Sequence, residues 1–166
     1  MICERTIKMK VFLAAPYMLF FSTESGVEPV FRDRINGVLA TIQKKNVTVL
    51  SAYARENWVA DLDEPEDAVN YDFRAIEEAD FLIAFIGDKT PSNGVLMEVG
   101  FAAAHKKRIC IFYKKNLKPF PFLARGLNTW TDTELVEYKN DADAYKKLDK
   151  LLEKELGAAN YISSIA

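Results

Sequence analysis

The sequence has few of the residues on which disulfide frameworks and common metal sites depend. It contains one histidine and two cysteines, and Cys3 and Cys110 lie far apart in the chain. Cys110 also falls within an apolar stretch that is typical of a buried strand. This pattern matches neither a disulfide scaffold nor a metal-binding motif, so we expect no metal cofactor.

Long apolar runs and an excess of positive charge are missing as well. No stretch approaches the roughly 18 apolar residues of a membrane-spanning helix, and the N-terminus lacks the apolar segment and small-residue cleavage site of a signal peptide. The formal net charge is -2. The basic cluster of Lys106, Lys107 and Arg108 lies at the end of a predicted helix, where cations complement the helix dipole. We therefore expect a cytoplasmic protein with no nucleic-acid partner and no membrane partner.

Several nucleotide and hydrolase motifs are absent. The first predicted strand ends in Ala14, Ala15 and Pro16, without the glycine-rich turn of a dinucleotide fingerprint or a Walker loop. No serine stands in a nucleophile elbow. His105 lies near the end of a predicted helix, which indicates a surface or helix-capping position. Redox, kinase and serine-hydrolase chemistry are thus disfavoured, and we expect no organic cofactor.

The chain does contain apolar stretches of strand length that alternate with segments of helical periodicity. Strands are predicted at 8–15, 47–51, 81–86, 109–113 and 135–138, helices at 31–42, 64–79, 94–106 and 142–156, and a short helical turn at 122–128. This alternation predicts a mainly parallel five-stranded sheet covered on both faces, as in a flavodoxin-like or Rossmann-like α/β three-layer sandwich. The length favours a single domain over residues 1–166.

Two long connectors interrupt this pattern. Residues 17–29 begin with a run of aromatic and apolar side chains, which either pack beneath the loop or in a subunit interface, or form a wall for a planar ligand. Residues 52–67 form a polar, acidic connector that carries Arg55 and Trp58. Loops of this length inside a compact domain are more often functional than idle.

The segment 91–101 follows the most strand-like stretch of the chain and passes through a turn into a predicted helix. It should therefore lie at the carboxyl edge of the sheet, where open α/β folds bind ligands. Glu98 is the one carboxylate among the apolar residues of this segment. An idle charge is costly in such surroundings, so Glu98 is either paired or functional.

A carboxylate on the first turns of a helix can act as a nucleophile. Glu98 could attack a glycosidic carbon while the backbone amides of Ser92, Asn93 and Gly94 bind a neighbouring anionic or hydroxyl group. A second carboxyl group would protonate the leaving base or activate water, and Asp72 is the candidate. Spacing alone favours the simpler interpretation of Asp72 as a solvated residue at the edge of its helix.

At these residues the chain resembles the nucleoside 2-deoxyribosyltransferase superfamily, and within it the nucleoside 5'-monophosphate N-glycosidases, including cytidylate hydrolases. The resemblance covers roughly residues 9–156. The matching positions, in the order of the family's motifs, are Phe12, Leu13, Ala14, Ala15 and Pro16, then Asp72, Ala79 and Asp80, then Ser92, Gly94, Glu98 and Gly100.

The resemblance implies a role for each matching position. Glu98 would be the nucleophile, and Asp72 would orient or protonate the base. Ser92 stands where the nucleoside transferases have an aspartate that binds the 5'-hydroxyl group, whereas the monophosphate hydrolases have a serine, which can donate to phosphate. The other implied substrate-binding positions are Phe12, Tyr17, Arg55, Trp58, Asn93, Gly94 and Asn128, with 126–128 supplied by the neighbouring subunit of a homodimer or a dimer of dimers.

The resemblance also shows one departure. Met18 stands where the hydrolase branch has a phosphate-binding arginine. Without that charged contact the binding free energy of the phosphate falls by about 1.5–3 kcal/mol, unless Arg55, Arg32 or Arg34 replaces it.

We expect hydrolysis of a pyrimidine nucleoside 5'-monophosphate, with CMP favoured, through a covalent glycosyl-glutamate intermediate to free base and ribose 5-phosphate. The alternatives are a 2-deoxyribosyltransferase that exchanges bases and a nucleotide-binding module without catalysis.

Overall fold

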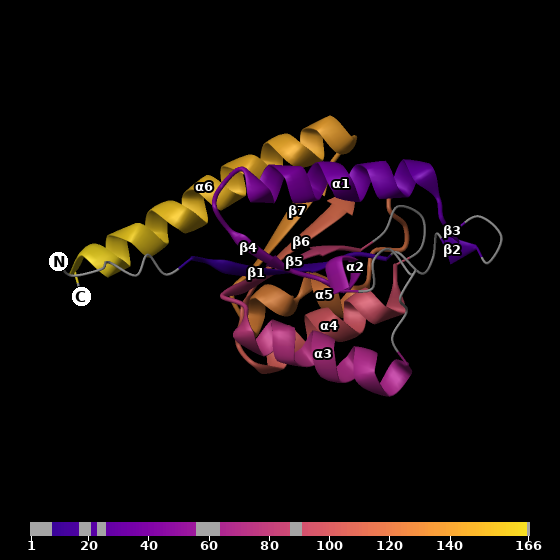
Figure 1. Cartoon of the computed structure of the whole chain (residues 1–166), viewed down its shortest axis with the longest axis horizontal. Helices are drawn as coiled ribbons and strands as arrows, with labels where there is room; N and C mark the ends of the chain where they lie inside the picture. Colours follow the sequence, from indigo (N-terminus) through magenta and orange to yellow (C-terminus); the bar gives the residue numbers. More distant parts are fainter. Residues whose placement is uncertain (1–7, 17–20, 23–25, 56–63, 87–90, 166) are drawn as a thin grey trace.

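A computed structural model of the chain describes residues 8–16, 21–22, 26–55, 64–86 and 91–165 (Figure 1). The elements, in chain order, are β1 (Lys10–Ala14), β2 (Phe21–Ser22), β3 (Gly26–Val27), α1 (Pro29–Gln43), β4 (Thr48–Leu50), α2 (Ala52–Arg55), α3 (Pro65–Glu78), β5 (Phe81–Phe85), α4 (Asn93–Ala104), β6 (Arg108–Lys114), α5 (Phe122–Arg125), the 3-10 turn η2 (Leu127–Thr129), β7 (Thr133–Tyr138) and α6 (Asp141–Ile165).

The main sheet has five strands in the order β4-β1-β5-β6-β7, and every neighbouring pair is parallel. The register places Phe12 of β1 opposite Leu50 of β4 and Leu82 of β5. This is the doubly wound order of flavodoxin-like folds, so the predicted fold class is confirmed. Because the order reverses at β1, the carboxyl ends of β1 and β5 flank the crevice where such folds bind ligands.

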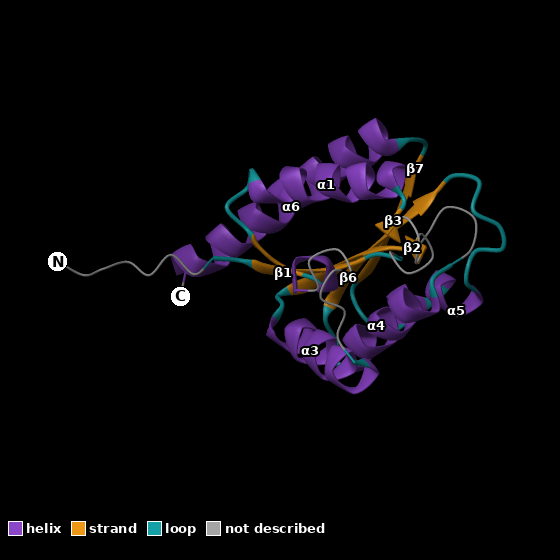
Figure 2. Ribbon diagram, turned by 45° about the vertical axis from the view of Figure 1, so that its right-hand side comes forward, coloured by secondary structure: helices purple, strands orange, loops and turns teal. Residues whose placement is uncertain are grey.

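Helices cover both faces of the sheet. Figure 2 shows α1 and α6 on one face and α3, α4 and α5 on the other. Side chains alternate along β1, so Val11 and Leu13 join the core beneath α1 and α6, whereas Phe12 and Ala14 join the core beneath α3 and α4. Strands buried on both faces have continuous apolar sequences, which is why their positions were predictable.

Three segments differ from the predictions. Within the connector predicted over 17–29, β2 and β3 pair as a small antiparallel hairpin. The connector predicted from residue 52 begins with the helical turn α2. Helix α6 continues past the predicted end at 156 to Ile165, and Figure 1 shows this end projecting beyond the sheet.

The basic residues that follow α4 have structural partners. His105 caps the end of α4, as predicted, and Lys107 Nζ donates to the main-chain oxygens of Glu77 and Ala79. Arg108 forms ion pairs with three acidic side chains, those of Asp132, Glu134 and Glu155. Cys110 is buried and free. In the described part of the chain, the helices are all too short or too polar to cross a membrane.

Candidate active site

The N-terminus of α4 forms one side of the candidate site. The backbone N–H of Ser92 donates to the main-chain oxygen of Ile86 at 3.2 Å, which ties the start of α4 to the end of β5. Ser92 is the N-cap residue, and its Oγ accepts a hydrogen bond of 3.4 Å from the N–H of Val95. The hydroxyl proton of Ser92 and the first N–H groups of the helix, from Asn93 and Gly94, can therefore donate to an anion.

Gly94 has no packing reason to be glycine within the described structure. A Cβ atom built there would meet only Ser92 Oγ, at 3.8 Å, which is an ordinary contact. As far as the described residues are concerned, a ligand can therefore approach the backbone at Gly94 closely.

Glu98 lies just over one turn into α4, with its carboxyl group directed inward. Oε2 is inaccessible to solvent and has no hydrogen-bond partner among the described residues, although the residue as a whole is only partly buried. Burial first, and the negative charge of Asp72 second, raise the pKa of Glu98, and the positive charge of Arg55 opposes both, so that the pKa lies at about 8. Glu98 therefore carries a proton at neutral pH in the free protein.

Asp72 and Arg55 form an ion pair next to Glu98. Arg55 Nη1, at the end of α2, lies 2.8 Å from Asp72 Oδ1 on α3, and the two side chains are 24% and 15% exposed. The Arg55 guanidinium also lies 5.2 Å from the centre of the Tyr71 ring. Asp72 is thus a shielded, paired carboxylate, and the reading of Asp72 as a solvated edge residue is wrong.

The structure therefore brings Glu98, Asp72, Arg55 and the start of α4 to one edge of the sheet. Phe12 does not reach an open surface in the described structure, because its side chain is 1% exposed within the core beneath α3 and α4. The predicted positions Tyr17 and Trp58 lie outside the described residues, as does Met18.

Asn128 is exposed on η2, away from the N-terminus of α4. The neighbouring Trp130 donates from Nε1 to the main-chain oxygen of Ala103 at the end of α4, so η2 lies beside the opposite end of that helix. Arg32 and Arg34 lie on α1, which covers the other face of the sheet, and Arg34 pairs with Asp141. Of the three arginines that could replace the phosphate-binding arginine of the hydrolases, Arg55 is thus the one that lies next to the carboxylates.

Sequence reasoning missed the pairing of Arg55 with Asp72 and the position of Tyr71 beside them. Arg55 and Asp72 are separated by the connector after β4, so no local pattern joins them. Predicting this ion pair would have required the order of the strands in the sheet. That order places β4 and β5 on either side of β1, and Arg55 follows β4 whereas Asp72 lies on the helix before β5. In the described part of the chain, no group of three or more histidine, cysteine or acidic side chains could hold a metal ion.

The fold and the site define a flavodoxin-like α/β protein with a shielded glutamate oxygen beside an ion-paired aspartate at the carboxyl edge of its sheet. The sequence model of the family described as nucleoside 2-deoxyribosyltransferase matches residues 12–153. The chain belongs to this family, and it is an enzyme of nucleoside and nucleotide metabolism.

Relatives and solved structures agree with this assignment. A protein of Thermofilum pendens with a provisional assignment as 2'-deoxynucleoside 5'-phosphate N-hydrolase 1 is 30% identical over 148 residues, which are 87% of this chain and 95% of that protein. The CMP N-glycosidase BcmB of Clostridium botulinum is 26% identical, with a TM-score of 0.65 over 84% of this chain and 98% of that one. The solution structure of BlsM is 29% identical, with a TM-score of 0.75 over 92% and 94% of the two chains.

Proposed function

We propose that the protein hydrolyses the N-glycosidic bond of a pyrimidine nucleoside 5'-monophosphate, with CMP as the favoured substrate. The observation that carries this proposal is the shielded carboxyl group of Glu98, which lies beside the Arg55–Asp72 ion pair and on the helix that Ser92 caps. The names of the Thermofilum pendens relative and of BcmB support the reaction class and a phosphorylated substrate.

The two carboxyl groups together hold one proton, which is the proton that the departing base requires. The proton of Glu98 first passes to Asp72. The Glu98 carboxylate then attacks the anomeric carbon, the bond from that carbon to the base nitrogen breaks with its electron pair going to the base, and Asp72 delivers the proton to the base. The product of this step is a glycosyl ester of Glu98. Water then adds at the anomeric carbon, the ester bond breaks, and ribose 5-phosphate leaves as the proton of water returns to the carboxyl pair.

The N-terminus of α4 is proposed to bind the 5'-phosphate. Ser92 can donate its hydroxyl proton while its oxygen keeps the capping bond from Val95, and the amides of Asn93 and Gly94 add further donors. A serine at this position places no negative charge against the phosphate. Arg55 contributes the positive charge closest to the carboxylates and keeps Asp72 in place.

Base release from a matched panel of nucleosides and 5'-monophosphates tests the proposal. Chromatography of the products should show free cytosine and ribose 5-phosphate from CMP, slower release from cytidine, and no release by Glu98→Gln. Faster cleavage of the nucleosides than of their monophosphates would contradict the assignment of Ser92 to phosphate. Mass spectrometry of enzyme quenched during turnover should detect the glycosyl ester in the parent protein and not in Glu98→Gln.

Base exchange is the second candidate function, because the matching family is described as a transferase. Both reactions share the glycosyl ester and differ only in the acceptor. Incubation of CMP with an excess of a different free base separates them. A new nucleotide containing the added base would identify a transferase, whereas ribose 5-phosphate alone supports hydrolysis. Tight CMP binding without any base release would instead indicate a binding module.

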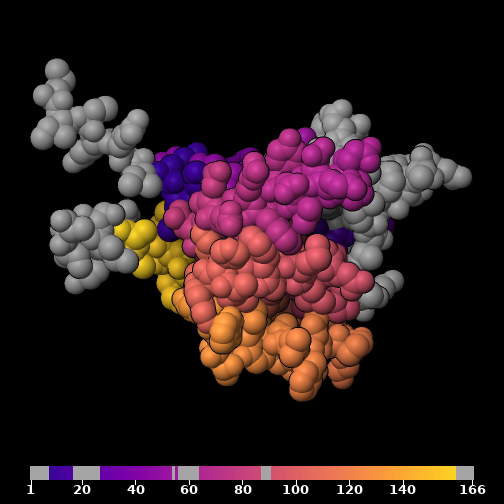
Figure 3. Space-filling view, turned by 90° about the horizontal axis from the view of Figure 1, so that it is seen from below, coloured from indigo at the N-terminus to yellow at the C-terminus, as the bar shows by residue number. Residues whose placement is uncertain are grey.

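We further propose that the chain is a single domain that works as a homodimer or a dimer of dimers, in the cytoplasm. The face formed by α3, α4 and α5 is shown in Figure 3. It carries large apolar side chains that are more than half exposed, notably Phe122 at 83% and Leu123 at 81% on α5, with Met97 on α4 and Trp130 after η2. A patch of this kind is typical of a protein interface, and Asn128 is exposed within the same segment.

A further inference from the structure

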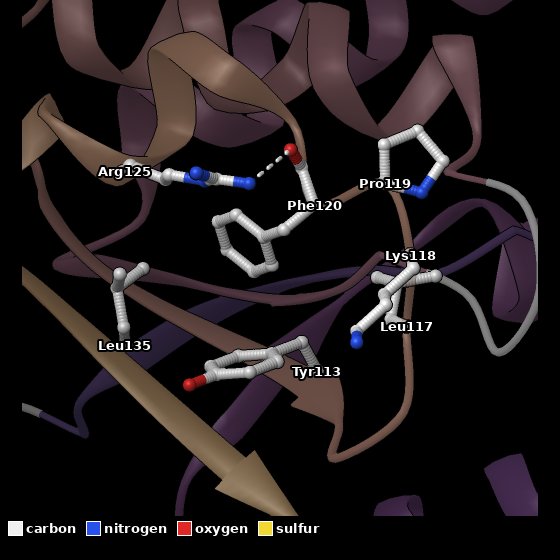
Figure 4. Close-up of a pocket in the computed structure, with 7 residues that line it drawn as sticks. All are labelled: Tyr113, Leu117, Lys118, Pro119, Phe120, Arg125 and Leu135. Atoms are coloured by element: carbon white, nitrogen blue, oxygen red, sulfur yellow. Dashed lines mark hydrogen bonds between the residues drawn. The ribbon is translucent and has the colours of Figure 1, made fainter.

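A hollow opens at the carboxyl end of β6, with a volume of about 740 Å³. Figure 4 shows its lining, which comes from β6, β7, α5 and the loop between β6 and α5. None of these residues belongs to α2, α3 or α4, which carry Arg55, Asp72 and Glu98. The hollow is therefore lined by elements other than those that carry these three residues.

Aromatic side chains form the centre of this hollow. The rings of Tyr113 and Phe120 meet edge to face with their centres 4.7 Å apart. The Arg125 guanidinium lies 6.0 Å from the centre of the Phe120 ring, and Leu135 of β7 closes the side opposite Lys118 (Figure 4). Apolar ring faces of this kind contact planar ligands well.

The charges at the hollow are positive and are not neutralised. Lys118 and Arg125 both line it, whereas none of the described residues that line it is acidic. Within the described residues Arg125 donates only a long hydrogen bond, of 3.5 Å, to the main-chain oxygen of Phe120, and Lys118 forms neither a hydrogen bond nor an ion pair. Arg108 and Arg34, by contrast, each have acidic partners. In a protein of net charge -2 this pair of cations is a local departure that favours an anionic ligand.

We infer that the hollow binds a small planar aromatic anion, a ring that carries a phosphate or a carboxylate group. The ring would lie against Phe120 and Tyr113, and Lys118 and Arg125 would supply the positive charge for the anionic group. A second copy of the chain fits less well, because the most exposed apolar residues, Phe122 and Leu123, do not line the hollow. The inference holds whatever substrate reacts at Glu98.

Amide NMR titration of the Glu98→Gln variant tests this site, because residues in the hollow and at the start of α4 report separately and no substrate is consumed. The probes are phenyl phosphate, benzoate and CMP, with ribose 5-phosphate for charge without an aromatic ring and cytidine for a ring without charge. Phenyl phosphate or benzoate should shift the amides of Leu117, Lys118, Phe120 and Arg125. Ribose 5-phosphate and cytidine, judged from the same amides, should bind at least about tenfold more weakly. Shifts with CMP alone would identify the source of the ligand as a nucleotide.

Matched variants decide whether the hollow itself is responsible. Lys118→Ala and Arg125→Gln should each weaken the binding of the anionic probes about tenfold or more, since each removes a charge-assisted contact, and Phe120→Leu should weaken the ring-bearing probes. Lys115→Ala is the control, because Lys115 is an exposed lysine of the same loop that does not line the hollow. The inference is overturned if millimolar probes leave these amides unmoved, if Lys115→Ala has the same effect as Lys118→Ala, or if the amides shift with protein concentration instead, which would identify a second copy as the occupant.

Discussion

Glu98 is the residue whose environment departs furthest from that of an ordinary carboxylate. Its Oε2 is shut off from water without a hydrogen-bond partner in the described structure, and Asp72 adds negative charge nearby. Such a group holds its proton at neutral pH. If Asp72 passes this shared proton to the leaving base, the singly protonated pair is the active form.

The first prediction concerns the pH dependence of turnover. Because the active pair needs one proton and the pKa of Glu98 is about 8, kcat/KM should be level just below pH 8 and fall about tenfold per pH unit above it. Steady-state rates with CMP between pH 6.5 and 9.5 measure this limb. A rate that instead climbs toward pH 8 would show that Glu98 reacts as an anion without a general acid.

The same proton affects stability. The unfolded chain loses it near the ordinary glutamate value of 4.5, whereas the folded protein keeps it up to about 8. Raising the pH through this window therefore favours the unfolded state. We expect the free energy of unfolding to fall between pH 5 and pH 8, relative to Glu98→Gln, by on the order of 3 kcal/mol in urea denaturation. Glu66→Gln, at an exposed glutamate of α3, is the control and should show no such difference.

Arg55 is predicted to set the charge of the carboxylate pair. The Arg55 guanidinium pairs with Asp72 and lowers the pKa of Glu98. Arg55→Gln removes this cation and should therefore raise the pKa of Glu98, so that the alkaline limb of kcat/KM moves above pH 8. The rate at pH 7.5 should drop by about tenfold or more, as for loss of a charged hydrogen bond. Arg55→Lys should restore the position of the limb. Arg74→Gln, at an exposed arginine of α3, should leave both unchanged, and a limb that stays in place in Arg55→Gln would refute the role.

Sequence analysis could single out Glu98 and Asp72 but not the relation between them. Glu98 is conspicuous because it is a lone carboxylate in an apolar helix. The ion pair of Asp72 is not visible in the sequence, since Arg55 stands seventeen positions away across a connector of no regular pattern. Only the fold brings the two side chains together.

At the scale of elements, the N-cap residue of α4, Ser92, is proposed to combine helix capping with phosphate binding. Ser92→Asp tests these roles separately, because aspartate caps helices as well as serine does but places a negative charge against a phosphate. We expect kcat/KM for CMP to fall about tenfold or more and that for cytidine to be preserved, with little change in melting temperature. Ser92→Ala should instead lower stability by about 1 kcal/mol through loss of the cap. Equal losses for CMP and cytidine would argue against phosphate binding at Ser92.

The elements that sequence analysis placed well are those buried on both sides. Strands β1, β5 and β6 appear as continuous apolar stretches because helices cover both faces of the sheet. The two-residue strands β2 and β3 are too short for any periodicity to be visible. The end of α6 extends past the sheet, so no buried stripe marks where the helix stops.

At the scale of the whole molecule, the two faces of the sheet differ in what they leave exposed. The cover of α1 and α6 is tied together by ion pairs such as Lys45 with Asp149 and Arg34 with Asp141. The face of α3, α4 and α5 carries the exposed apolar side chains of the proposed interface. If Asn128 serves a site, it is expected to be that of a subunit docked on this face, because Asn128 lies away from the Ser92 end of α4 in its own chain.

Subunit complementation tests whether Asn128 serves the neighbouring site. Glu98→Gln and Asn128→Ala should each be nearly inactive as pure proteins. When the two are co-expressed or refolded together, half of the dimers are mixed, and each mixed dimer has one site with an intact Glu98 and an intact Asn128 from different chains. Base release should then recover to about a quarter of the parent rate. If Asn128 acts within its own chain, no mixed dimer holds an intact site and the mixture stays inactive. Leu123→Glu in both partners is the control, because a charge at that exposed leucine should prevent docking and abolish the recovery.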